Sequence, residues 1–333
     1  MTCALLTLMS AEEVAADPAR WHKHRRAGVG ASEIAGVLGL RSAFRGPVAT
    51  WWAKVSPDPA GDEDDRFGLG LFLEPYVAGL LEARYPHLTL ARGGLYASSR
   101  WPLMLATPDY LATTPDGVTF PIQVKSVATW VSEDPAHCWG TPPDGAVPPH
   151  YDAQCIQEAA VTDAPVCWLA ALNRMTGELR VYEVLIDEIA GHDQWVMARA
   201  IEEFMGLVEA RTPPPPDGRP DTTDALRAMY AAADGGTVRI PRRLAHRLRA
   251  AQAAKSAADA RYAEAQNEVR ARLGTATTAV TRGGDVVAVR SVYTEQRVNL
   301  RRLRRRAPRT AQRHTEPRQI DKLLVKAARN PEE

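Results

Sequence analysis

The sequence predicts an α/β domain followed by a region of different composition. Helix-like stretches flank a series of short β-like stretches between residues 88 and 185, and helices around several strands indicate an α/β fold. The stretch TPPPPDGRPDTTD at residues 212–224 then interrupts the pattern. Because consecutive prolines favour extended geometry, this stretch is typical of a linker.

The first helices are marked by capping signals. Ser10 is followed three residues later by Glu13, which predicts a capping box at the start of a mostly helical stretch over residues 10–40, and Ser32 offers a second helix start. Residues 70–86 predict a further helix with apolar side chains on one face.

Turn residues divide the middle of the chain into strands. Gly, Pro and Asp separate the β-like stretches from one another. We expect strands at 88–98, 102–114, 118–127, 166–173 and 178–185, and helices at 150–160 and 188–209.

The region after the proline run predicts one long Ala-rich helix that ends at Gly274, then a hairpin that turns at Gly283 and Gly284. The expected segments are a first domain at 1–211, the linker at 212–224, a helix-and-hairpin extension at 225–300 and a basic tail at 301–333. A tail of this charge can bind DNA phosphates, and the long helix can serve as a partner surface.

The composition favours an intracellular protein. Hydrophobic residues make up 45% and charged residues 24%, as in soluble globular domains. The four cysteines form no CxxC pair, which argues against a cysteine-held zinc or iron–sulfur centre. No signal peptide and no apolar run of membrane-spanning length is recognisable, so we expect a cytoplasmic location.

The stretch FPIQVKS at 120–126 carries the main chemical signal, together with Asp109 in TPDY. Gln123 and Lys125 are two residues apart in a strand, so their side chains face the same side. A carboxylate and the carbonyl of Val124 are suitable ligands for Mg²⁺, and a lysine beside them can act on water or phosphate. The pattern is weak by itself, because many surface hairpins contain it.

Three further stretches, in this order, strengthen the signal: WHKHRRAGVGASEIAGVLG at 21–39, GLFLEPYVAGLLE at 70–82 and HYDAQCIQEAAVT at 150–162. Together with the strand motif they resemble the phage lambda exonuclease and YqaJ viral recombinase family of the PD-(D/E)xK nuclease superfamily. The resemblance covers residues 15–210. It implies a PD-(D/E)xK core, in which a central mixed sheet is flanked by helices.

The resemblance also implies an activity and partners. Members of the family are Mg²⁺-dependent hydrolases that degrade double-stranded DNA ends 5′→3′ and leave a 3′ single strand for an annealing recombinase. They act in phage-type DNA recombination, so a bacterial or phage-infected cell is the expected setting. Some form ring-shaped homo-oligomers, and a ring trimer is the form that the resemblance implies.

Four positions match the catalytic centre of the family. Asp109 matches a metal-binding aspartate, Lys125 the catalytic lysine and Glu74 a helix glutamate at the metal site. Gln123 stands where a second metal-binding glutamate is usual, and Val124 would contribute its carbonyl oxygen. Mn²⁺ is an alternative to Mg²⁺ at such a site. For Glu74, an ordinary exposed helix position remains an alternative.

Three other positions match residues that hold the DNA end. Arg25 and Ser32 match binders of the terminal 5′-phosphate, and Gln154 matches a helical glutamine near it. A planar guanidinium with a hydroxyl suits a phosphate. Alternatively, Arg25 pairs with a surface carboxylate, Ser32 only caps a helix, and Gln154 is a buried structural glutamine.

Gln123 leaves two outcomes open. An amide oxygen can still bind a hard cation, and QxK branches of the superfamily exist, so we expect an active enzyme with weaker metal binding. The alternative is a catalytically weakened protein that binds DNA ends. A restriction-type endonuclease is a third possibility, but an endonuclease has no need of residues for a terminal phosphate.

Overall fold

The computed structural model describes residues 5–56, 65–132, 134, 137–232, 235–294 and 300–315. The chain divides into two compact units, and the boundary falls between Ala231 and Ala232. In the described ranges, no helix has both the length and the apolar character needed to cross a membrane.

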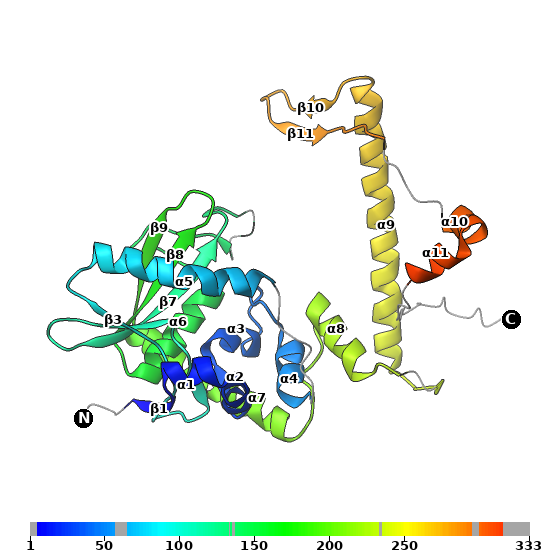
Figure 1. The fold of residues 1–333 in the computed structure, drawn as a ribbon. Coiled ribbons are helices and arrows are strands. Elements are labelled where there is room, and N and C mark those ends of the chain that lie inside the picture. The colour runs from blue at the N-terminus through cyan, green and yellow to red at the C-terminus, as the bar shows by residue number, and fades with distance from the viewer. Residues whose placement is uncertain are drawn as a thin grey trace. The chain divides into compact units, whose positions relative to one another are not determined.

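A five-stranded mixed sheet forms the centre of the first unit (Figure 1). Its order is β3-β6-β7-β8-β9, in which β7 and β8 are parallel and the other neighbours antiparallel. The strands are β3 (Thr89–Arg92), β6 (Tyr110–Thr113), β7 (Thr119–Val127), β8 (Val166–Asn173) and β9 (Leu179–Leu185). The predicted α/β class with a mixed sheet is therefore confirmed.

A smaller four-stranded sheet has the order β1-β4-β5-β2. It consists of β1 (Leu6–Met9), β4 (Leu95–Ala97), β5 (Met104–Ala106) and β2 (Val29–Gly30). The helix α6 (Pro149–Thr162) contacts strands of both sheets, among them β4, β5, β7 and β8. Because α6 packs against both, it buries most of its residues and shows no wide polar face.

The helix α5 (Asp65–Arg84) covers the other face of the five-stranded sheet (Figure 1). Val77 and Leu81 on α5 share a hydrophobic core with Ile122 and Val124 of β7. Since side chains alternate along a strand, Gln123 and Lys125 of β7 face the opposite side, toward α6. This alternation separates the apolar and the chemically active side chains of β7.

The other helices of the first unit pack against α6, against the small sheet or against one another. They are α1 (Ala11–Ala16), α2 (Pro18–Arg26), the 3₁₀ turn η1 (Ala31–Glu33), α3 (Ile34–Val37), α4 (Pro47–Val55), α7 (Glu188–Glu209) and α8 (Pro220–Met229). The capping box at Ser10 is present, because Ser10 Oγ accepts from Glu13 N at 3.2 Å and Ser10 N donates to the Glu13 carboxylate at 2.8 Å. The second start at Ser32 is instead a 3₁₀ turn that begins at Ala31.

The segment after the proline run is attached to the first unit. Arg219 donates to the carbonyl oxygens of Arg41 and Ala43, and Asp221 accepts from Gly46 N at 2.5 Å. These bonds hold α8 against α4. The unit boundary therefore falls after the proline run rather than at its start.

The second unit contains a long helix, a hairpin and two short basic helices. They are α9 (Arg242–Leu273), β10 (Thr278–Val280), β11 (Val286–Val289), α10 (Leu300–Arg306) and α11 (Pro308–Arg313). Gly274 follows α9 with φ +55°, and Gly284 in the hairpin turn has φ +91°, a conformation that favours glycine. The part of the expected basic tail beyond residue 315 lies outside the described residues.

Candidate active site

One cavity of about 360 Å³ is lined by the residues that the sequence associates with catalysis. Glu74 comes from α5, Asp109 from the turn before β6, and Gln123, Val124 and Lys125 from β7. The fold therefore brings together five residues that are spread over some fifty positions of the chain.

Strand register explains how Asp109 reaches β7. The first paired residue of β6, Tyr110, lies opposite Ile122 of β7, so Asp109 lies immediately before β6. Its Oδ2 accepts from Val124 N at 2.6 Å and from Gln123 Nε2 at 2.5 Å. Because the N–H and C=O of one strand residue point to the same side, the carbonyl of Val124 is directed to the same side as Asp109.

Two carboxyl groups with raised pKa values share this cavity. Burial raises the pKa of Asp109 to about 7, although the charge of Lys125 lowers it, and Glu74 raises it further. Burial also raises the pKa of Glu74, against the effect of its 2.7 Å ion pair with Arg92. The positive charge near Asp109 and Glu74 therefore does not offset the free-energy cost of burying an ionised carboxylate.

The residues of the cavity fit a divalent cation. Gln123 Oε1 is buried and has no hydrogen-bond partner in the described part of the chain, which is an uncommon state for a buried acceptor. Hard cations such as Mg²⁺ take oxygen ligands of these types. Across the described ranges no three His, Cys, Asp or Glu side chains are grouped for a metal, so the amide and backbone oxygens would have to complete the ligand set.

Lys125 lies on the α6 side of the sheet. Its Nζ is 5.3 Å from the ring centre of Tyr151 on α6, a distance suited to a cation–π contact. Its charge also lowers the pKa of Asp109. The ammonium group is thus placed between an aromatic support and the carboxylate cavity.

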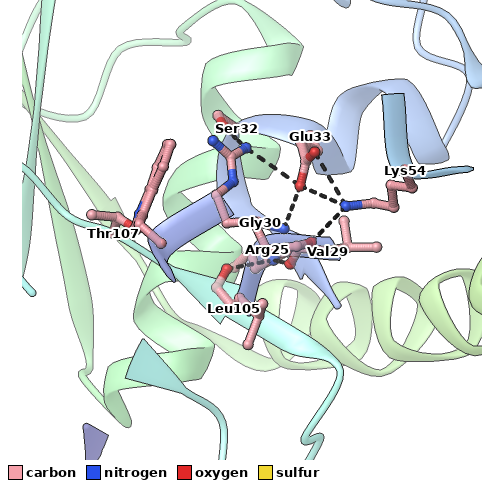
Figure 2. A network of polar contacts seen from close by, with 10 residues as sticks. Arg25, Val29, Gly30, Ser32, Glu33, Lys54, Leu105 and Thr107 are labelled. Carbon is pink, nitrogen blue, oxygen red and sulfur yellow. Dashed lines mark hydrogen bonds and ion pairs between the residues drawn. The ribbon is translucent and has the colours of Figure 1, made fainter. Parts of the chain in front are cut away.

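A second polar cluster surrounds Arg25 at the end of α2 (Figure 2). Arg25 Nη2 donates to Ser32 Oγ at 3.1 Å and lies 3.3 Å from Glu33 Oε2. The guanidinium carbon is 4.6 Å from the centre of the Trp21 ring. The hydroxyl of Ser32 therefore bonds to Arg25, and the Gly30 N–H that precedes the 3₁₀ turn donates to Glu33 instead, at 2.8 Å.

Trp21 connects the two clusters. The guanidinium of Arg25 stacks on its ring, and Trp21 also lines the carboxylate cavity. Its Nε1 donates to Thr107 Oγ1 at 3.2 Å, which fixes the ring two residues before Asp109. Trp21 therefore belongs both to the Arg25 cluster and to the lining of the cavity that contains Lys125.

Glu33 and Lys54 complete the Arg25 cluster, and the sequence did not single them out. Lys54 Nζ lies 3.1 Å from Glu33 Oε2 and donates to the Arg25 carbonyl oxygen at 2.9 Å. Glu33 belongs to the Ala-Ser-Glu part of the quoted motif, and that was the available signal. Lys54 appears in sequence only as a lysine within an apolar helix.

Gln154 is placed differently from the other expected residues. It is 6% exposed on α6 and is not among the residues that line the cavity. Its Nε2 donates to Oε1 of the fully buried Glu158 at 2.9 Å. Burial, and next the charge of Asp109, raises the pKa of Glu158 to about 8. A polar pair four residues apart within an apolar helix was the only sequence signal for Glu158.

One family model matches part of the chain. Residues 20–165 match the family model of the YqaJ-like viral recombinase domain, so the resemblance predicted from the sequence is confirmed. No curated protein matches the sequence.

Two similar solved structures are of the alkaline exonuclease LHK-Exo from Laribacter hongkongensis, one of them in complex with dAMP. Each is 16% identical and covers 64% of this chain and 99% of the other, with a TM-score of 0.44. Because this similarity is low, the site assignment depends on the residues of this chain.

Proposed function

We propose that the chain is a metal-dependent deoxyribonuclease that degrades double-stranded DNA 5′→3′ from its ends, in keeping with the match of residues 20–165 to the YqaJ-like viral recombinase domain. The observation that carries this proposal is the position of Trp21. Its ring lines the carboxylate cavity and holds Arg25, so a group suited to a terminal phosphate lies next to a group suited to hydrolysis.

The hydrolytic side follows from the chemistry of its residues. Asp109, Glu74, Gln123 Oε1 and the Val124 carbonyl would hold Mg²⁺ or Mn²⁺. When bound, such an ion supplies an activated water and positive charge for the phosphate. Lys125 orients that water and stabilises the charge that develops on the phosphate oxygens, which is the main requirement of phosphodiester hydrolysis.

The end-binding side favours an exonuclease over an endonuclease. The planar guanidinium of Arg25 and the hydroxyl of Ser32 are hydrogen-bonded to each other, and together they can bind several oxygens of a terminal phosphate. An endonuclease cuts within the strand and has no use for this pair. The 3′ single strand, the annealing recombinase as partner, the ring trimer and a role in phage recombination are further parts of the proposal.

One observation favours a second candidate, a DNA-end-binding protein with weak catalysis. Gln123 Nε2 donates to Asp109 Oδ2, so the amide occupies an oxygen that a metal ion would use. The amide also lacks the negative charge of the usual glutamate. Metal affinity would then be too low for efficient cleavage, while the Arg25 cluster would still bind DNA ends.

Digestion of linear duplex DNA separates the candidates. Duplexes with 5′-phosphate or 5′-hydroxyl ends would be incubated with Mg²⁺, Mn²⁺ or EDTA, and end labels would report polarity. We expect metal-dependent loss of the 5′ strand, faster at phosphorylated ends, and a decrease of roughly 100-fold or more in Lys125→Ala. Cleavage by Lys125→Ala at the unaltered rate would refute the assignment of Lys125. Binding of phosphorylated ends without cleavage would support the second candidate.

A further inference from the structure

We propose that the partly buried ion pair of Glu33 and Lys54 positions Arg25 and keeps the phosphate site positively charged. The inference rests on the proposed role of Arg25 in binding a terminal phosphate. It assigns positioning roles to two residues that would not touch the DNA themselves.

The geometry places Glu33 between two cations. Arg25 Nη2 is 3.3 Å and Lys54 Nζ 3.1 Å from the same carboxylate oxygen, Oε2 (Figure 2). The side chain of Lys54 is 2% exposed, and that of Glu33 is 19% exposed. Solvent therefore screens this arrangement weakly, and the charges act strongly on one another.

The balance of charge explains why a lysine is needed. Burial raises the pKa of Glu33, but the charges of Arg25 and Lys54 lower it to about 2, so Glu33 is ionised at neutral pH. Without Lys54, the carboxylate would neutralise Arg25 and weaken its attraction for phosphate. With Lys54 present, the three side chains keep a net positive charge, and Arg25 is free to share its remaining donors.

Close packing shows that the orientation of Arg25 is also controlled. A Cβ atom at Gly30 would lie 3.1 Å from Arg25 Nε and Nη2, and 3.2 Å from Glu33 Oε2. The backbone thus lies directly against the ion pair, and Trp21 covers the guanidinium. Lys54 additionally bonds to the carbonyl oxygen of Arg25 itself. The ammonium of Lys54 therefore holds both the carboxylate partner of Arg25 and its main chain.

A simpler alternative is that the ion pair only stabilises the fold by connecting α4 to the 3₁₀ turn. In that case, loss of the pair would lower the free energy of unfolding and affect all DNA ends equally. A positioning role makes a different prediction, because only the preference for 5′-phosphate should change. Charge balance makes a further prediction. A variant that lacks the charges of both Glu33 and Lys54 should regain the 5′-phosphate preference that loss of the Lys54 charge alone removes.

The test is the ratio of dissociation constants for blunt duplexes with 5′-hydroxyl and 5′-phosphate ends, measured in EDTA so that cleavage plays no part. The variants are Arg25→Ala, Lys54→Met and the double variant Glu33→Gln/Lys54→Met. Lys255→Met, at an exposed lysine of α9, is the matched control. Urea unfolding and circular dichroism identify any variant that fails to fold.

We expect Lys54→Met to lower the phosphate preference by roughly tenfold, toward that of Arg25→Ala, because a charge-assisted contact is lost. The double variant should regain most of the preference, and Lys255→Met should keep all of it. A double variant that is as impaired as Lys54→Met would overturn the inference, as would an unchanged preference in Lys54→Met.

The failure of the proposed function has another signature. In that case the unaltered protein would bind 5′-phosphate and 5′-hydroxyl ends equally well, and Arg25→Ala would do the same. That result would refute the phosphate site and the inference with it, whereas a preference lost only in Arg25→Ala refutes the inference alone.

Discussion

The two sides of the candidate site differ in how their charges are balanced. Around Arg25, the carboxylate of Glu33 contacts two cations, and its pKa lies far below the ordinary value. Around Asp109, burial raises the pKa of the carboxyl group, and the oxygen Oε1 of Gln123 has no partner within the described residues.

This difference predicts how far each side depends on a bound ion. In the Arg25 cluster the carboxylate of Glu33 already has two cationic partners, so this cluster needs no added cation. The Asp109 side carries unbalanced buried oxygens, which a divalent cation would balance. We therefore expect DNA-end binding to persist under conditions in which the metal side is empty or disordered by charge repulsion.

The largest expected effect concerns Glu158, whose carboxyl is fully buried and is affected by the charge of Asp109. Its folded-state pKa of about 8 lies above the ordinary value of 4.5, so the folded protein keeps a proton that the unfolded chain releases. The free energy of unfolding should then fall as pH rises from 4.5 to 8, by about 5 kcal/mol at most.

Glu158→Gln should remove this decrease, because the amide keeps an acceptor for Gln154 without a titrating proton. Urea unfolding at pH 5, 6.5 and 8 measures it, and the variant should gain stability relative to the unaltered protein as pH rises. A variant whose stability falls as steeply with pH as that of the unaltered protein would show that Glu158 does not titrate in this range.

Glu33 should produce the opposite dependence on pH. Its pKa is lowered from 4.5 to about 2, so its contribution is fully present above pH 4.5 and is lost as pH falls toward 2. The expected contribution is about 3 kcal/mol. Acid titration of unfolding should therefore be less steep below pH 4.5 in Glu33→Gln, and equal slopes in both proteins would contradict the buried ion pair.

The smallest expected effect is a gain in metal affinity in Gln123→Glu. A carboxylate next to Asp109 adds like charge, so the melting temperature should fall in EDTA. The same charge should strengthen Mn²⁺ binding by roughly tenfold, since carboxylates are stronger ligands than amides. Melting curves over a Mn²⁺ titration measure both effects.

Gln154→Glu is the matched control for this change. It places a new carboxylate beside Glu158 rather than in the cavity, so it should lower stability in EDTA without a larger response to Mn²⁺. If Gln123→Glu and Gln154→Glu respond to Mn²⁺ alike, the metal does not bind at Gln123.

The local elements were predictable from sequence to a large extent. The capping box at Ser10 and the helix at Glu188–Glu209 are present in the structure, and β7 covers the stretch that contains Gln123. Such features depend on neighbouring residues and on the spacing of apolar side chains, which a sequence displays directly. The role of Ser32 was less predictable, because whether its hydroxyl caps a helix or bonds to Arg25 depends on a side chain seven residues away.

By itself the sequence determined the α/β class, the order of the elements and the family motifs, because periodicity and turn residues act over short distances. It also indicated Asp109 and Lys125 as candidates. Only the tertiary structure decided which charges meet. Lys54 reaches Glu33, and Asp109 reaches Gln123, through helix packing and strand register, and the pKa values of these groups depend on that burial. The charge pairing around Arg25 and the buried oxygens around Asp109 are therefore properties of the packed fold.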